Sequence, residues 1–163
     1  MSLPLDSDGF LRRECPSCKR EFKWLPTQGA ADAEPAAETY YCPYCYEAAA
    51  PNSWYTKAQV EVAGQVVQKE ALEPRVRSFL SGLKSLERPG GSFRVEVNPP
   101  SYPQPTALTE PDDMDRVDFP CHPQEPLKVD PTWNEEVGCL VCGFRYPVDL
   151  VRALPNDEPS ATI

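Results

Sequence analysis

Seven cysteines and one histidine are the residues of this chain whose types and spacing could do chemistry. They fall into four pairs, three of them C-x-x-C motifs: Cys15/Cys18, Cys42/Cys45, Cys121/His122 and Cys139/Cys142. Tetrahedral Zn²⁺ takes four sulfur or nitrogen ligands, and a C-x-x-C motif points two thiolates at one ion. Eight ligands therefore predict two zinc ions, each with a closed shell. A closed shell is structural, because a catalytic zinc keeps one position open for water or substrate.

The order of the pairs predicts how the ligands are shared between the two ions. One ion is expected on Cys15, Cys18, Cys42 and Cys45, and the other on Cys121, His122, Cys139 and Cys142. Neighbouring side chains normally diverge, so Cys121 and His122 can share an ion only if the flanking Pro120 and Pro123 force a turn. Two alternatives stay open: His122 unbound beside three cysteines, or a cross-braced arrangement, as in RING fingers, in which the first and third pairs share an ion. The 75 residues between the second and third pairs favour the sequential arrangement.

Other uses of the cysteines find less support. Seven is an odd number, which excludes complete disulfide pairing within one chain. The first residues show neither the basic start nor the apolar run of a secretory signal, and no stretch approaches the roughly 18 apolar residues of a membrane span. We therefore expect a cytoplasmic protein with no membrane partner. In that reducing compartment such spacing is typical of zinc, and the sequence lacks the βαβ context of a thioredoxin-like redox motif.

Enzymatic activity is not predicted. If His122 is a zinc ligand, no Ser/His or Cys/His catalytic pair can form, since it is the only histidine. The chain has no H-x-E motif of a zinc deaminase and no glycine-rich phosphate loop. Its acidic runs, at residues 112–115 and 135–136, show no spacing that singles out a catalytic pair of carboxylates, and they are predicted to be solvated loops.

The composition explains why metal is needed for folding. Proline accounts for 20 of 163 residues, over twice the usual share of about 5%, and each proline removes a backbone donor. Such a chain can build only small cores, split between modules. A structural zinc site contributes roughly 10–16 kcal/mol in finger peptides, about as much as the whole stability of a typical domain. The sequence thus predicts a small zinc-stapled α+β fold.

Four segments are expected along the chain. Residues 1–56 predict a zinc ribbon whose hairpin tip, residues 26–38, is flexible. Residues 53–88 predict a helix with an apolar stripe, kinked at Pro74. Residues 92–151 predict a β-rich zinc module, and residues 152–163 a flexible tail. The strands of the module are expected at 92–97, 116–119, 127–129 and 144–151, where residues alternate or apolar β-branched residues gather.

Residues 12–56 also carry a resemblance. The pattern Arg13-x-Cys-x-x-Cys-x-x-x-Phe22, followed by Tyr41-Cys-Pro-Tyr-Cys45 and Trp54, resembles a bacterial zinc-ribbon protein of the kind labelled by similarity to the ribbon of transcription factor IIB. Such ribbons recur in transcription factors, ribosomal proteins and docking adaptors, so the resemblance implies fold and metal rather than function. One departure is Tyr46, which stands where glycine often follows the second knuckle.

Two functions remain in view. The first is a non-catalytic zinc-binding adaptor or regulatory protein that acts through protein–protein contacts. The alternative is a nucleic-acid-binding or transcription-associated protein that uses a basic and aromatic face of residues 10–46, including Arg12, Arg13, Lys19, Arg20 and Lys23. Residues 1–56, 57–96 and 97–163 carry net charges of −3, +2 and −8, and the chain carries −9. This acidity disfavours a phosphate backbone and favours the adaptor.

Overall fold

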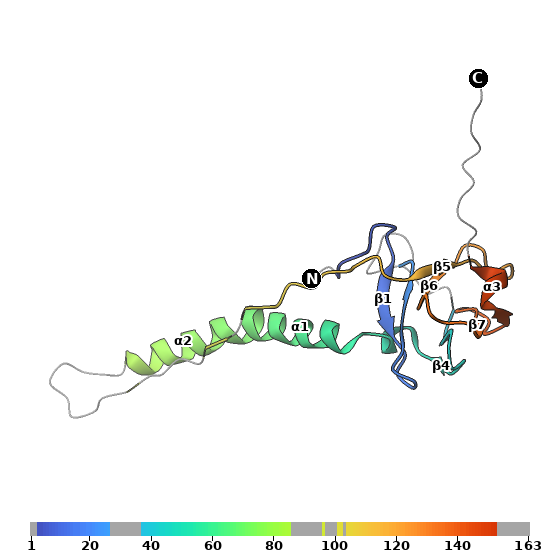
Figure 1. Cartoon of the computed structure of the whole chain (residues 1–163). Helices are drawn as coiled ribbons and strands as arrows, with labels where there is room; N and C mark the ends of the chain where they lie inside the picture. Colours follow the sequence, from blue (N-terminus) through green and yellow to red (C-terminus); the bar gives the residue numbers. More distant parts are fainter. Residues whose placement is uncertain (1–2, 27–36, 86–95, 97–100, 103, 153–163) are drawn as a thin grey trace, which may run out of the picture. The chain divides into compact units, whose positions relative to one another are not determined.

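Two compact units make up the protein. The computed structural model describes residues 3–26, 37–85, 96, 101–102 and 104–152 (Figure 1). Residues 58–108 belong to a helical unit, and residues 3–57 with residues 109–152 belong to a second one, which we call the sheet unit. In the described part of the chain, no helix combines the length and apolar character that crossing a membrane requires.

A four-stranded antiparallel sheet forms the centre of the sheet unit. Its strand order is β1 (Leu11–Glu14), β2 (Glu21–Trp24), β6 (Leu127–Val129) and β5 (Asp115–Val117). The sequence predicts separate N- and C-terminal modules, whereas here Trp24 of β2 lies opposite Leu127 of β6. Pairing with β6 removes the free edge that β2 would otherwise expose, and a two-stranded hairpin alone is only marginally stable. The two halves of the chain therefore share one sheet.

Two smaller hairpins carry the later C-x-x-C motifs. β3 (Tyr40–Tyr41) pairs with β4 (Ala48–Ala49), and β7 (Glu136–Gly138) pairs with β8 (Arg145–Pro147). A short 3₁₀ turn, Pro51–Ser53, follows the first hairpin, and the helix α3 (Val148–Val151) follows the second. The strand expected over residues 144–151 is thus shorter than predicted and ends in a helix. Most of residues 92–97 and of the tip 26–38, and all but one residue of the tail, lie outside the described residues.

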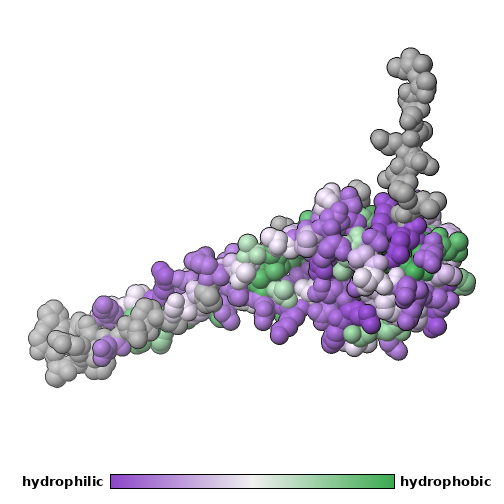
Figure 2. All heavy atoms as spheres, viewed as in Figure 1, coloured by the Kyte–Doolittle hydropathy of each residue, from purple (hydrophilic) through white to green (hydrophobic). Residues whose placement is uncertain are grey.

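One apolar core serves both halves of the sheet unit. Phe22 and Trp54 are fully buried and meet edge to face, with ring centroids 5.7 Å apart. The same cluster contains side chains from β5, β6 and β7 and three of the cysteines: Val117, Leu127, Val137, Cys15, Cys42 and Cys139. Burying one such large apolar side chain contributes roughly 1.5–3 kcal/mol. The cores are joined rather than split between modules, while hydrophilic residues cover most of the visible surface of the unit (Figure 2).

The helical unit contains one continuous helical segment. It consists of α1 (Lys57–Val67), a π-helical stretch η2 (Gln68–Leu72) and α2 (Glu73–Lys84). Pro74 has no N–H to donate, and its ring would clash with the carbonyl group one turn earlier in an α-helix. The hydrogen bonding changes just before Pro74, where the N–H of Glu73 donates to the carbonyl of Gln68, five residues earlier. The disturbance expected at Pro74 therefore takes the form of a π-helical turn that precedes it.

Candidate metal centres

The first cluster brings the two N-terminal C-x-x-C motifs together. The Sγ atoms of Cys15 and Cys45 are 3.6 Å apart and those of Cys18 and Cys42 are 3.7 Å apart. All four sulfurs lie within 4.8 Å of one another. Four thiolates bound tetrahedrally at about 2.3 Å from one ion stand about 3.8 Å apart, so this spacing fits a metal ion of that size. The donor set and its geometry could hold one metal ion.

The three C-x-x-C motifs fold into the same knuckle. In each, the residue after the second cysteine has a left-handed backbone: φ is 61° at Lys19, 64° at Tyr46 and 69° at Gly143. The N–H of that residue donates to the carbonyl of the first cysteine at 2.9–3.1 Å. Backbone N–H groups also point at sulfur, as from Cys18 to Cys15 at 3.4 Å. The repeated geometry shows that the knuckle is set by local sequence.

Tyr46 occupies the position where the resemblance expects glycine. Its backbone adopts the left-handed conformation that glycine would adopt, and its side chain contributes contacts of its own. The hydroxyl of Tyr46 donates to the carbonyl of Glu136 at 3.0 Å, and the guanidinium of Arg145 lies 3.8 Å from its ring centroid. These contacts link the first hairpin to the second and offset the strain of the left-handed backbone.

Lys19 has the same strained backbone on an exposed side chain, which allows a direct test. We expect Lys19→Gly to stabilise the protein by up to about 1 kcal/mol. A left-handed residue with a Cβ costs roughly 1–2 kcal/mol, and the larger conformational entropy that glycine loses on folding offsets part of the gain. Thermal unfolding of the metal-saturated protein measures the change. Ser17→Gly, also exposed in this knuckle and without positive φ, should destabilise it. Equal losses in the two variants would show that Lys19 is not strained.

The second cluster contains the three other cysteines and His122. The Nδ1 atom of His122 is 3.4 Å from the Sγ of Cys139, and the sulfurs of Cys121 and Cys142 are 3.6 Å apart. All four ligand atoms lie within 4.8 Å of one another. The groups are those of the sequential arrangement, not of the cross-braced one. Among the described residues, these two clusters are the groups of histidine, cysteine and acidic side chains placed to hold a metal ion.

A tight turn lets Cys121 and His122 face the same point. The N–H of His122 donates to the carbonyl of Phe119 at 3.1 Å, and the N–H of Glu125 donates to the carbonyl of His122 at 3.0 Å. Pro120 and Pro123 lie within this turn, as the sequence requires for adjacent ligands. The turn therefore replaces the knuckle that the other three ligand pairs use.

Buried thiols in both clusters stay protonated unless a bound cation stabilises the thiolate form. Burial raises the pKa of Cys42 well above its usual range and that of Cys139 to about 12. Burial also acts on the more exposed Cys121, but hydrogen bonds, first from Tyr146, outweigh it and lower the pKa to about 7. Metal binding at either cluster must therefore release protons from buried thiols, and its affinity should fall as the pH falls.

The two clusters are joined through their knuckles. The N–H of Tyr41 donates to the carbonyl of Leu140 at 2.8 Å, and the N–H of Gly138 donates to the carbonyl of Pro43 at 2.9 Å. A Cβ on Gly138 would lie 2.9 Å from the ring of Tyr46, and one on Gly143 2.9 Å from the ring of Tyr41. The two hairpins thus pack closely enough to require glycine. Sequence reasoning, which treats the clusters as independent modules, misses this junction, although the two glycines beside the last knuckle are a signal for it.

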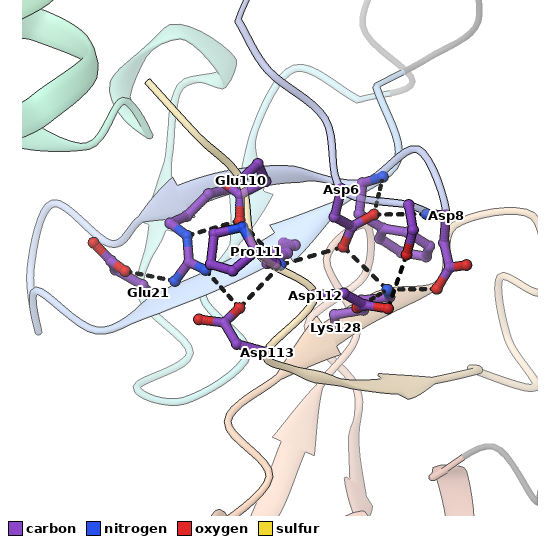
Figure 3. A network of polar contacts seen from close by, with 12 residues as sticks. Asp6, Asp8, Glu21, Glu110, Pro111, Asp112, Asp113 and Lys128 are labelled. Carbon is purple, nitrogen blue, oxygen red and sulfur yellow. Dashed lines mark hydrogen bonds and ion pairs between the residues drawn. The ribbon is translucent and has the colours of Figure 1, made fainter. Parts of the chain in front are cut away.

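A buried ion network lies on the other strands of the sheet unit (Figure 3). Lys23 and Lys128 are register partners on β2 and β6, and their side chains are 0% and 2% exposed. Both ammonium groups meet the fully buried carboxylate of Asp6, at 3.2 and 3.0 Å. Lys23 also contacts Asp113 at 3.0 Å, and Lys128 contacts Asp112 at 2.6 Å. Asp112 and Asp113 lie in an exposed loop, as predicted for this acidic run, and their carboxylates also neutralise the buried lysines, whereas Asp115 begins β5.

The basic face expected on residues 10–46 is largely neutralised or covered. Arg12 contacts three carboxylates, those of Glu21, Glu110 and Asp113. Arg13 is buried, with its guanidinium 4.4 Å from the ring centroid of Trp24 and 4.9 Å from that of Tyr55. Lys23 is enclosed in the ion network. Lys19 and Arg20 stay exposed, and Arg20 stacks over Trp133 at 4.8 Å.

A cleft of about 440 Å³ lies beside this face, and its lining carries charges of both signs. Two arginines and three carboxylates line it, together with a tyrosine, a methionine and a proline: Arg12, Arg20, Glu21, Asp113, Asp130, Tyr44, Met114 and Pro131. Neither histidine nor cysteine belongs to this lining, and the hydroxyl of Tyr44 is used structurally, since it donates to the carbonyl of Glu21 at 3.0 Å. The cleft does not assemble a nucleophile with a base.

Comparison of the chain with models of protein families, with curated proteins and with solved structures finds no match in any of the three. The resemblance to a transcription factor IIB ribbon therefore has no independent support at the level of a family. The two clusters suggest metal-binding modules in a small α+β protein, and they do not assign the protein to a family.

Proposed function

We propose that the protein is a non-catalytic zinc-binding adaptor that acts through protein–protein contacts. The observation that carries the proposal is that four protein side chains complete each cluster, so that a tetrahedral ion would have no open position. Thiolate and imidazole ligands in tetrahedral groups suit zinc, which has no redox chemistry of its own. In this role Zn²⁺ would supply structural stability to the sheet unit.

Surface features support protein contacts as the output. The helical unit exposes large apolar side chains, with Phe79 65% and Val60 and Val67 each 58% exposed. Apolar residues grouped on an exposed helix are typical of a helix that another protein covers. The sheet unit supplies the rigid, metal-bound part of such an adaptor.

The nucleic-acid alternative has less support. A strand of nucleic acid needs several unpaired cations along its path, and the affinity grows with the number of phosphates neutralised. Three of the five basic residues counted for this face, Arg12, Arg13 and Lys23, are held by carboxylates or aromatic rings. Two exposed cations, Lys19 and Arg20, are too few for tight binding on a chain with a net charge of −9.

Affinity purification with and without nuclease tests the choice between these functions. We expect the tagged full-length protein to retain protein partners after nuclease treatment, and to bind single-stranded DNA or RNA no more tightly than about 10⁻⁶ M at physiological salt, the level of non-specific binding. Reversal of charge at Lys19 and Arg20 should leave the recovered proteins unchanged. Loss of all partners on nuclease treatment, or a nanomolar nucleic-acid complex, would replace the adaptor with the alternative.

A further inference from the structure

Four exposed apolar residues share one face of the helical segment. Val60, Val67, Leu72 and Phe79 are 58%, 58%, 46% and 65% exposed. The steps from 60 to 67 and from 72 to 79 are seven residues, two turns of an α-helix, which returns to nearly the same face. The step from 67 to 72 crosses η2, where hydrogen bonds join residues five apart, so that residues five apart align as residues four apart do in an α-helix. The π-helical turn thus keeps the four residues in register.

Another face of the same helix is already in use. The N–H of Thr106 donates to the side-chain oxygen of Gln65 at 2.9 Å, and Lys69 donates to the side chain of Gln104. Gln65 lies five residues beyond Val60, about 140° around the helix axis. The returning chain at residues 104–106 therefore binds a side of the helix away from the exposed apolar residues.

Positive charge accompanies the apolar residues. α2 carries three exposed basic residues, Arg75, Arg77 and Lys84, against one acidic residue, Glu73, and the guanidinium of Arg77 pairs with the carboxylate of Glu73 at 2.5 Å. Arg75 lies three residues after Leu72 and four before Phe79, so that it sits on their face. We call Val60, Val67, Leu72, Arg75 and Phe79 the exposed helix face. It combines a line of apolar side chains with a cation and holds no carboxylate of its own.

We propose that the exposed helix face binds an acidic amphipathic α-helix of another protein. Apolar residues of that helix at heptad spacing would cover the four apolar side chains, and a carboxylate of that helix would pair with Arg75. Charge selects this occupant over a second copy of the chain, because a second copy would bring Arg75 against a face without a carboxylate. The inference rests on the proposed adaptor function and names the surface and the partner's chemistry.

Site-specific photo-crosslinking in the full-length protein tests the inference. A photoreactive phenylalanine analogue replaces Phe79, and the same analogue at Leu150, an apolar residue 71% exposed on the sheet unit, is the matched control. We expect the probe at position 79 to attach to a helical, acidic segment of another protein, and the probe at position 150 not to reach it. Arg75→Glu should lower the yield by about tenfold or more, the loss typical of a central interface residue. Exchange of the partner's nearest carboxylate for lysine should then restore the yield.

The other outcomes each reject a different statement. Attachment of the probe at position 79 to this same chain from another molecule would make the occupant a second copy. Equal yields with and without Arg75→Glu, or attachment to a basic segment, would reject the acidic helix. Partners captured only from position 150 would reject the exposed helix face and keep the adaptor function. Capture from neither position, with no partner after affinity purification, would reject the adaptor function itself.

Discussion

Replacing Cys42 by serine is expected to release both metal ions and to unfold the entire sheet unit, beyond the ribbon of residues 12–56. Three thiolates leave the first ion open to water, and a structural zinc site contributes roughly 10–16 kcal/mol, about the whole stability of a small domain. The loss spreads because the knuckle that holds Cys42 is bonded to the second cluster, from Tyr41 to Leu140 and from Gly138 to Pro43. The metal content measured by elemental analysis should fall from two ions per chain, zinc under the proposed function, to none, and the dispersed amide signals of the folded protein should be lost.

Ser17→Ala is the matched control for this experiment, because Ser17 is exposed in the first knuckle and contributes a backbone N–H to the sulfur of Cys15 that alanine preserves. This variant should keep two ions and the wild-type spectrum. A Cys42→Ser protein that retains one ion and an ordered second cluster would show that the two clusters fold independently.

The same coupling predicts that His122→Ala, at the other cluster, lowers the metal affinity of the first cluster as well.

The local parts of this molecule follow from its sequence, and the long-range parts do not. Two residues between cysteines determine the knuckle, so the ligand pairs and their grouping could be predicted from spacing. The pairing of β2 with β6 joins segments about 100 residues apart, and no local pattern specifies that register. The helix of residues 57–84 was predictable from its apolar stripe, but the π-helical form of its disturbance depends on how the backbone relaxes around Pro74.

The buried lysines show the same limit at the level of one residue. In Glu21–Trp24 the charged Lys23 alternates with Phe22 and Trp24, a pattern typical of a strand with one solvated face. That face is covered here, because the N-terminal residues and the segment 110–113 bring carboxylates onto it. The carboxylates that cover this face come from segments distant in sequence. Alternation therefore predicts on which face of the strand Lys23 lies, but it does not predict that Lys23 is buried.

Lys128→Met is expected to destabilise the sheet unit by about 3–5 kcal/mol, the cost of removing one partner from a buried ion pair. The carboxylate of Asp6 would keep only the ammonium of Lys23, at 3.2 Å, and its other buried charge contact would be lost. Lys19→Met, at an exposed lysine, should change the stability by less than about 0.5 kcal/mol. Asp6→Asn added to Lys128→Met should recover part of the loss, because it removes a buried carboxylate that has lost one of its two ammonium partners. Urea unfolding of the metal-saturated proteins measures all three changes.

The pH dependence of this loss identifies its electrostatic origin. Burial alone would raise the pKa of Asp6, but the N–H of Phe10 and the two ammonium groups outweigh it and lower the pKa. A lowered carboxyl pKa gives stability that is complete above the unfolded value of about 3.9 and is lost as the pH falls through the folded value. The pKa of Lys128 is raised, so its contribution is complete below the unfolded value of about 10.4 and is lost only as the pH rises through the folded value. The difference between wild type and Lys128→Met should therefore stay constant from about pH 5 to 9. Proton competition for the thiols acts on both proteins and cancels in that difference. The difference should then shrink as the pH rises above about 10.4, where the charge of Lys128 begins to lose its stabilising effect. A difference that stays unchanged above this pH would show that lost packing, rather than the ion network, destabilises the variant.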